Sequence, residues 1–451
     1  MVPHSLVNSS LSVISMNIKK VIVLLSYNFQ LKNRSFPLGW LEMAIFLILL
    51  ILFSPFAFSS SMTTPQVKIG LENLLENHLD LVRGKKLGVL ANQTSVDSKG
   101  RHIVELLSEH SQIVTVLFGP EHGFMGDVED AALISDSVYE DIRLYSLYGE
   151  YLTPTPRMLK DVDVLVYDIQ DVGVKFYTFI SNLFLAMHAA KRDSIPIFVL
   201  DRPNPVNAEI VRGAITNPAF SSFVGVFPLP IRYGMTVGEI AELFNNETYG
   251  GFSLGVELTV IPMTGYKRDM WYDEMEIPWI VPSPNMPTLE TAVIYPGMCL
   301  MEGTNLSEGR GTDTPFLTIG APYIDSKEWL DAIPGEVLAG VKAVPCAFQP
   351  KVIPGVVSRP KYRDEKCHGL HFTVLDRDKL EPIALAVSLL CAAQKLYPEE
   401  YKMTKYLDKL WGNEDLRAMI SEGQDYRSIL QTCEQGLAQF KKVRKKYLRY
   451  D

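Results

Sequence analysis

Short runs of branched apolar residues recur along the first half of the chain, and helical patterns separate them. The runs lie at residues 85–92, 113–119, 162–169 and 195–205, and amphipathic helical spacing occupies 102–110 and 176–193. Strands rich in Val, Ile and Leu that alternate with helices form parallel sheets covered on both faces. The pattern therefore predicts an α/β fold built on a parallel sheet.

Polar residues follow these predicted strands at the points where the apolar runs end. In such sheets ligands bind beyond the carboxyl ends of the strands. The sequence "PEHG" at 120–123 is one of these exits, where Pro120 restricts the loop and Gly123 allows a sharp turn. We therefore expect the exit residues to face a cleft: Asn92, Gln93, Glu121, His122, Asp168, Asp171, Asp201, Arg202 and Asn204.

The pattern changes after about residue 262. A segment rich in Pro and Gly follows, and it gathers four polar side chains, Glu302, Asn305, Glu308 and Arg310. Mixed strand and helix patterns continue to a basic helical stretch at 437–450, which we interpret as a solvated face. A chain of 451 residues is long enough for two or three domains.

Charge and the N-terminal segment restrict the class of protein. The net charge of −9 argues against nucleic-acid partners and anionic membrane surfaces. Residues 43–61 form an apolar run followed by small residues, which indicates a signal peptide, with residues 1–42 as a long n-region or with Met43 as the true start. An uncleaved run would instead anchor the chain, and we expect no other membrane contact.

Several common catalytic motifs do not occur in the sequence. G-x-G-x-x-G, the Walker A motif, H-E-x-x-H and G-x-S-x-G are absent. His368 and His371 could be metal ligands, but no second pair of His or Cys residues at a metal-binding spacing accompanies them. We therefore predict no metal site and no cofactor.

Acids at the strand exits are the remaining catalytic candidates. A glutamate beside apolar walls can act as a general acid, and Phe118 and Phe124 are the walls expected for Glu121. In the alternative interpretation Glu121 caps a helix or pairs with an arginine. Asp168 and Asp171 are expected to hold loop amide groups. Arg202 either binds a carboxylate in bidentate fashion or ties its own loop.

The sequence resembles a known family in several long motifs. They include "GKKLGVLANQTSVDSKGRHIVELL", "LFGPEHGFMGD", "DVDVLVYDIQDVGVKFYTFI", "VLDRPNP", "RYGMTVGEIAELFN" and "PSPNMPTLETAVIYPGMCLMEGTNLSEGRGT". They are similar, in the same order, to motifs of the exo-β-N-acetylmuramidase family, formerly a domain of unknown function.

The resemblance implies a fold, an activity and a pair of catalytic residues. The fold is a Rossmann-like catalytic domain (residues 65–262) and a smaller α+β C-terminal domain (263–451), with the active cleft between them and a targeting region at 1–62. The activity is release of N-acetylmuramic acid from the non-reducing ends of peptidoglycan fragments. The catalytic residues map to Glu121 in "PEHG" and Tyr177 in "FYT".

Glycoside hydrolysis needs an acid for the leaving oxygen and a nucleophile or activated water. Glu121 is the predicted acid. Tyr177 is a nucleophile, a residue that orients water, or one that stabilises the charged ring. Attack by the acetamido group of the substrate itself is a further possibility. The sequence does not decide between retention and inversion at the anomeric carbon.

We predict that the remaining polar residues bind the sugar. The lactyl ether of muramic acid carries a carboxylate, for which Arg202 is the first choice, followed by Arg232 and Arg310. The other predicted substrate-binding residues are Asn92, Gln93, His122, Asp168, Asp171, Asp201, Asn204, Glu302, Asn305 and Glu308. The alternatives are a sugar-binding protein without activity and a metal-dependent phosphoesterase that uses Asp168 and Asp171.

Overall fold

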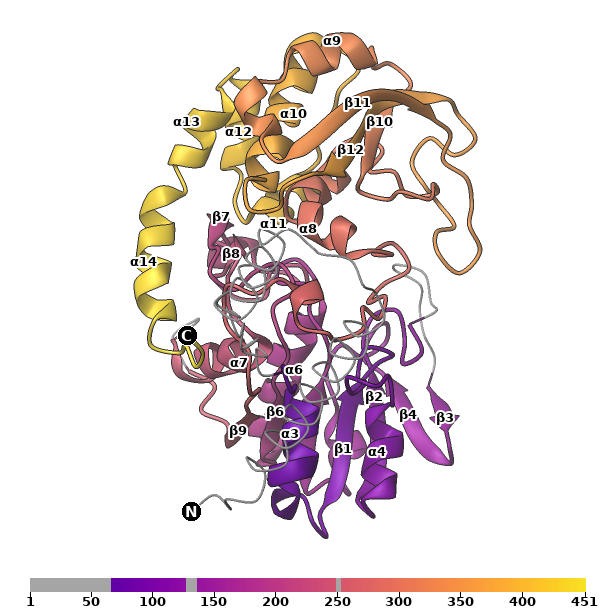
Figure 1. Ribbon diagram of the computed structural model, residues 1–451, viewed down its shortest axis with the longest axis vertical. Helices are drawn as coiled ribbons and strands as arrows, with labels where there is room; N and C mark the ends of the chain where they lie inside the picture. The colour runs from indigo at the N-terminus through magenta and orange to yellow at the C-terminus, as the bar shows by residue number, and fades with distance from the viewer. Residues whose placement is uncertain (1–65, 127–135, 249–252) are drawn as a thin grey trace, which may run out of the picture. The chain divides into compact units, whose positions relative to one another are not determined.

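The computed structural model describes residues 66–126, 136–248 and 253–451, so the predicted targeting region at 1–62 lies outside it. Within the described residues, the N-terminal part contains a seven-stranded sheet (Figure 1). In spatial order the strands are β3 (Ser137–Tyr139), β4 (Ile142–Ser146), β2 (Ile113–Gly119), β1 (Lys86–Ala91), β5 (Val164–Asp168), β6 (Ile197–Leu200) and β9 (Leu258–Ile261). Neighbouring strands are parallel except for β3 and β4. The predicted parallel sheet is confirmed.

Helices cover both faces of this sheet. The helices are α3 (Gly70–Asn77), α4 (Ile103–Glu109), α5 (Pro156–Leu159), α6 (Phe179–Asp193) and α7 (Val237–Asn246). Successive residues of β5 belong to opposite cores: Leu165 packs with the side chains of α6 and α7, and Val166 with those of α3 and α4. Burial on both faces is the reason that the strands are continuous apolar runs rather than alternating ones.

The C-terminal part contains a smaller antiparallel sheet and most of the remaining helices. Its strands lie in the order β10 (Thr318–Ala321), β12 (Cys367–Val374), β11 (Val341–Phe348). A separate antiparallel pair, β7 (Arg212–Ile215) and β8 (Pro230–Arg232), comes from the N-terminal part of the sequence. The helices are α8 (Leu289–Met298), α9 (Ser326–Asp331), α10 (Pro382–Leu396), α11 (Lys405–Trp411), α12 (Asp415–Ser421), α13 (Tyr426–Gln431) and α14 (Glu434–Arg444). Within the described ranges, no helix is both long and apolar enough to span a bilayer.

One hydrophobic core continues from the parallel sheet into this second part. It includes Tyr167 of β5 and Phe179 of α6, and also Tyr295 of α8, Leu370 of β12 and Leu389 of α10. Residues 64–451 accordingly form a single compact unit. This shared core fixes the side chains of α8 and its following loop relative to the strand exits of the parallel sheet.

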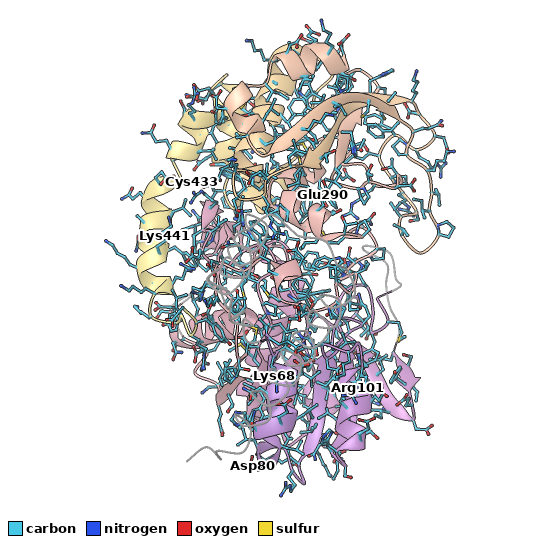
Figure 2. All side chains as sticks on the ribbon, in the orientation of Figure 1. Lys68, Asp80, Arg101, Glu290, Cys433 and Lys441 are labelled. Carbon is cyan, nitrogen blue, oxygen red and sulfur yellow. The ribbon has the colours of Figure 1, made fainter. Side chains whose placement is uncertain are left out.

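The basic C-terminal stretch is mostly a solvated face, in agreement with the sequence interpretation, because Lys442, Lys445, Lys446 and Arg449 are exposed, but one arginine is an exception. Lys441 is exposed on α14 (Figure 2), but Arg444 is buried and donates to the carbonyl of Gly234 at 2.7 Å. Beyond the helix, the hydroxyl of Tyr450 donates to the carboxylate of Asp201 at 2.5 Å. The end of the chain therefore ties down the exit loops of the parallel sheet, and its charges serve packing as well as solvation.

Candidate active site

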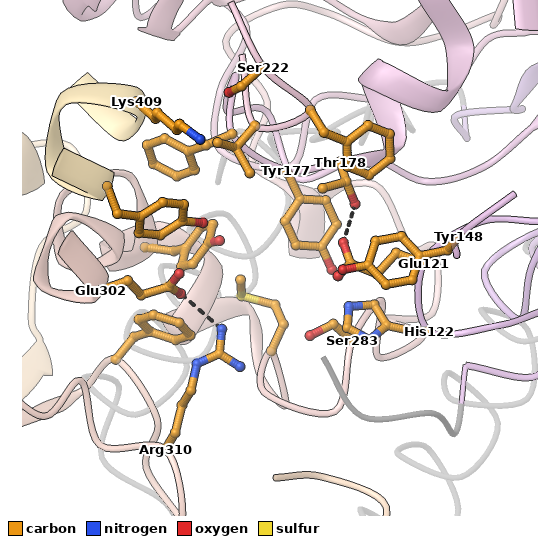
Figure 3. A pocket seen from close by; sticks show the side chains of 17 residues that line it. Glu121, His122, Tyr148, Tyr177, Thr178, Ser222, Ser283, Glu302, Arg310 and Lys409 are labelled. Atoms are coloured by element: carbon orange, nitrogen blue, oxygen red, sulfur yellow. Dashed lines mark hydrogen bonds and ion pairs between the residues drawn. The ribbon is translucent and has the colours of Figure 1, made fainter. Parts of the chain in front are cut away.

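A pocket of about 380 Å³ lies where the exit loops of the parallel sheet meet the second part of the chain (Figure 3). Its volume is within the range of small-molecule sites. One wall comes from the loops after β2 and β4 and from the start of α6, and the other comes from the 283–316 segment and α11. The lining residues are Glu121, His122, Tyr148, Phe176, Tyr177, Thr178, Ser222, Phe223, Val224, Ser283, Met286, Tyr295, Glu302, Arg310, Phe316, Tyr406 and Lys409.

The "PEHG" loop presents Glu121 to this pocket directly after β2. His122 and Gly123 both have left-handed backbone angles, with φ of 69° and 81°, and the Gly123 N–H donates to the Pro120 carbonyl at 3.1 Å. These two residues reverse the chain within one turn, and glycine adopts such angles without strain. The predicted strand-exit loop is confirmed. The predicted walls are wrong, because Phe118 and Phe124 lie in the two cores on either side of the sheet.

Two hydroxyl groups hold the Glu121 carboxylate. The Thr178 hydroxyl donates to its Oε2 atom at 2.6 Å (Figure 3). The Tyr148 hydroxyl forms a second hydrogen bond to the carboxylate. Burial raises the pKa of Tyr148 and the adjacent Glu121 raises it further, so Tyr148 stays a proton donor at neutral pH. Glu121 therefore has a defined orientation toward the pocket.

Tyr177 lies beside Glu121 with its hydroxyl directed at the same space (Figure 3). Its ring is buried against Phe179 and Tyr295 in edge-to-face contacts with centroid distances of 4.8 and 6.1 Å. Among the described residues, no group completes a hydrogen bond of ordinary geometry to this hydroxyl, although Ser283 is near enough to lower its pKa slightly. Burial dominates and raises that pKa well above 10, so the side chain is a neutral phenol. A buried, unsatisfied donor at a pocket wall is suited to a polar ligand.

The opposite wall carries an ordered arginine, Arg310. Its guanidinium pairs with Glu302 at 2.9 Å and with Glu308 at 3.5 Å, and it lies 5.2 Å from the ring centre of Phe316. Gly309 and Gly311 flank it with φ of 80° and 83°, and a Cβ atom on either would come within 2.5 Å of a backbone oxygen. The backbone around Arg310 thus requires glycine at both flanking positions of the motif "EGRGT", and this backbone presents Arg310 to the pocket.

The structure places Arg202 elsewhere, and its predicted role as the carboxylate-binding arginine is corrected. Arg202 pairs in bidentate fashion with Asp168 at 2.5 and 2.9 Å, and both side chains are buried, with 1% and 0% of their surfaces exposed. Neither residue lines the pocket. Arg202 therefore ties together the exits of β5 and β6.

Most other predicted binding residues also hold loops rather than line the pocket. Asn92 accepts from Thr94 N, Gln93 donates to Val281 O, Asp171 accepts from Gly173 N and the Tyr233 hydroxyl, Asp201 accepts from Gly238 N, Asn204 donates to Met235 O, Arg232 donates to Val206 O, and Asn305 accepts from Lys402 N. Glu308 pairs with Lys361 behind Arg310. Of the predicted site residues, the pocket brings together Glu121, His122, Tyr177, Glu302 and Arg310.

Sequence reasoning missed several pocket residues. Thr178 lies in the quoted motif that contains Tyr177, and its signal was adjacency to that residue. Tyr148 follows the exit of β4, a strand that the sequence pattern did not predict. Tyr406 and Lys409 come from α11, about 230 residues after Tyr177 in the chain. No local pattern marks them, because only the shared core brings α11 to the cleft.

Comparison with known proteins agrees with this arrangement. A curated relative, the peptidoglycan β-N-acetylmuramidase NamZ of Bacillus subtilis (strain 168), is 41% identical over 402 residues, which are 88% of this chain and 94% of the relative. Two crystal structures of DUF1343 family proteins from Bacteroides fragilis NCTC 9343 match with TM-scores of 0.78 and 0.69. Their identities are 30% and 29%, covering 86% and 85% of this chain and 99% of each matched chain.

Family models extend this likeness along the described chain. Residues 87–290 match the N-terminal model of exo-β-N-acetylmuramidase NamZ, and residues 293–450 match its C-terminal model. The two matches together cover the parallel sheet, the antiparallel sheet and both walls of the pocket. The chain therefore belongs to the exo-β-N-acetylmuramidase NamZ family.

Proposed function

We propose that this protein is a glycoside hydrolase that releases N-acetylmuramic acid from the non-reducing ends of peptidoglycan fragments. The observation that carries the proposal is a pocket of sugar size in which Glu121 and Tyr177, the two residues implicated by the family motifs, face the same space. The 41% identity to a peptidoglycan β-N-acetylmuramidase supports the substrate class.

In this mechanism Glu121 protonates the glycosidic oxygen as the bond to the leaving sugar breaks. Thr178 and Tyr148 orient its carboxyl group, which general acid catalysis requires because the proton must travel along a short, defined path. Water adds to the anomeric carbon as the leaving sugar departs. Tyr177 is a neutral phenol beside this centre, and its oxygen lone pairs can orient that water or stabilise the positive charge that develops on the sugar ring. The aromatic residues Phe176, Tyr295 and Phe316 supply the apolar part of the pocket lining.

A turnover assay tests this function. The purified protein should release N-acetylmuramic acid from a muramic-acid disaccharide and from a chromogenic muramic-acid glycoside, and the rates should be the same with and without a chelator. Binding of these sugars without turnover would instead indicate a sugar-binding protein. Chelator-sensitive release of phosphate from a phosphate ester would indicate the phosphoesterase.

We also expect the protein to be exported, because its proposed substrate is cell-wall material. The apolar run at 43–61 is the predicted signal peptide, with cleavage near Ser59, Ser60 or Ser61. N-terminal sequencing of the protein recovered from expressing cells and from their medium checks this. A cytosolic product that begins at Met1 would contradict it.

A further inference from the structure

The pocket has two chemically different ends. At one end Glu121, Tyr148, Tyr177 and Thr178 gather around the proposed reaction centre (Figure 3). At the other end the Arg310 guanidinium lines the cavity, on the opposite wall from Glu121 (Figure 3). A sugar in this pocket can therefore meet Glu121 and Arg310 at the same time.

Arg310 is held in advance in the orientation that binds a carboxylate. Two carboxylates and the Phe316 ring fix its planar guanidinium, so little conformational entropy is lost when a ligand binds. Only 17% of the Arg310 side chain is exposed, so an ion pair formed there is weakly screened. Lys409 of α11 is a second cation at the pocket wall.

The carboxylate that now pairs with Arg310 is itself in an unfavourable environment. Burial raises the pKa of Glu302, and the nearby carboxylates of Glu308 and, across the pocket, Glu121 raise it further. Lys361 opposes this increase, and Arg310 opposes it through the ion pair. Tyr406, a neutral phenol because burial raises its pKa, also faces this group. Glu302 thus can accept a proton when another anion arrives.

We propose that Arg310 binds the lactyl carboxylate of N-acetylmuramic acid and that this carboxylate takes the place of Glu302, which accepts a proton from solvent as the sugar binds. The proposal rests on the proposed function for the identity of the sugar. It makes Arg310 the residue that distinguishes N-acetylmuramic acid from N-acetylglucosamine, which lacks the lactyl group. Glu302 makes that recognition dependent on pH.

The direction of the pH dependence follows from the charges. An ionised Glu302 repels the lactyl carboxylate, and a protonated Glu302 does not. Binding should therefore be tightest below the pKa of Glu302 in the free protein. It should weaken as the pH rises through that pKa, which lies above the ordinary glutamate value. N-acetylglucosamine has no carboxylate, so its binding should not show this dependence.

Calorimetric titration of the full chain with free sugars tests recognition separately from catalysis. The ligands are N-acetylmuramic acid, its neutral lactyl amide and N-acetylglucosamine, and the proteins are wild type, Arg310→Met, Arg310→Lys, Lys409→Met and Glu302→Gln. Wild type should bind the acid about 10- to 100-fold more tightly than the amide, the range expected for a charged hydrogen bond. Arg310→Met should abolish this preference, and Arg310→Lys should restore only part of it because lysine lacks the planar fork.

The proton is measured in the same experiment. Above the pKa of Glu302 in the free protein, which burial raises to about 8, titrations in buffers of different ionisation enthalpy should show proton uptake when wild type binds the acid and none when it binds the amide. Glu302→Gln should keep the preference for the acid while losing both the uptake and the pH dependence.

Three results would overturn the proposal. They are equal binding of acid and amide by wild type, loss of the preference in Lys409→Met but not in Arg310→Met, and unchanged proton uptake in Glu302→Gln. If the sugars bind as expected but wild type hydrolyses no muramic-acid glycoside, the proposed function fails and the recognition site stands. If Arg310→Met does not fold, Arg310→Lys decides, because an unchanged preference for the acid in that variant would overturn the assignment to Arg310.

Discussion

Glu121→Gln is expected to lower kcat on a muramic-acid disaccharide by about 10²- to 10⁴-fold, the usual contribution of general acid catalysis. Glutamine keeps the size of the side chain and still accepts hydrogen bonds from Thr178 and Tyr148, but it has no proton to give. The loss should be much smaller on an aryl glycoside whose leaving group has a low pKa, because such a phenolate departs with little protonation. The measurement is the ratio of the two defects.

Two neighbours provide matched controls for this variant. Glu302→Gln removes a carboxyl group from the opposite wall of the same pocket, and its effect should not depend on the leaving group. His122→Gln alters the adjacent residue of the same loop and should cost less than Glu121→Gln. Equal defects of Glu121→Gln on both substrates would show that Glu121 is not the acid, and unfolding of that variant would show that the loop is structural.

Arg202→Met is expected to reduce the free energy of unfolding by about 3–5 kcal/mol, the usual cost of removing one partner from a buried ion pair. It leaves the Asp168 carboxylate fully buried without its bidentate partner. Urea denaturation measures this loss. Lys68→Ala breaks an exposed pair with Glu76 and is the control (Figure 2); that pair should be worth no more than about 1 kcal/mol.

A second substitution separates the charge from the packing at this pair. Asp168→Asn in the Arg202→Met background removes the uncompensated carboxylate, so it should recover part of the lost stability. A stable Arg202→Met protein that loses its preference for N-acetylmuramic acid over the lactyl amide would contradict the structural role. It would also support the original prediction that Arg202 binds the substrate carboxylate.

The order of strands and helices in the first half of the chain could be read from the sequence. Each of the four apolar runs contains one strand of the parallel sheet, and the run at 176–193 contains α6. These predictions succeeded because a strand buried on both faces must be a continuous apolar run. The periodic spacing of apolar residues along a helix is likewise visible within one short segment. Strands β3, β4 and β9 were not foreseen, since polar or charged residues interrupt their apolar residues and leave no continuous apolar run.

The site was predictable only in part. Position after a strand exit marked Glu121, and the family motif added Tyr177 and named both as catalytic. The same positional rule also selected Asp168, Asp171 and Asp201, whose side chains turn back to hold loops. The sequence shows that a polar residue follows the end of a strand, but the direction of its side chain depends on hydrogen-bond and ion-pair partners from distant parts of the chain.

The amino-acid sequence by itself determined the parallel sheet and the "PEHG" turn, because each depends on local backbone angles or on burial along one element. Only the tertiary structure decided which arginine reaches the pocket, which polar residues close the loops, and that the C-terminal residues Arg444 and Tyr450 bind the N-terminal part. Those contacts join residues as many as 249 positions apart. Their geometry follows from the packing of the shared core, which no short segment of sequence specifies.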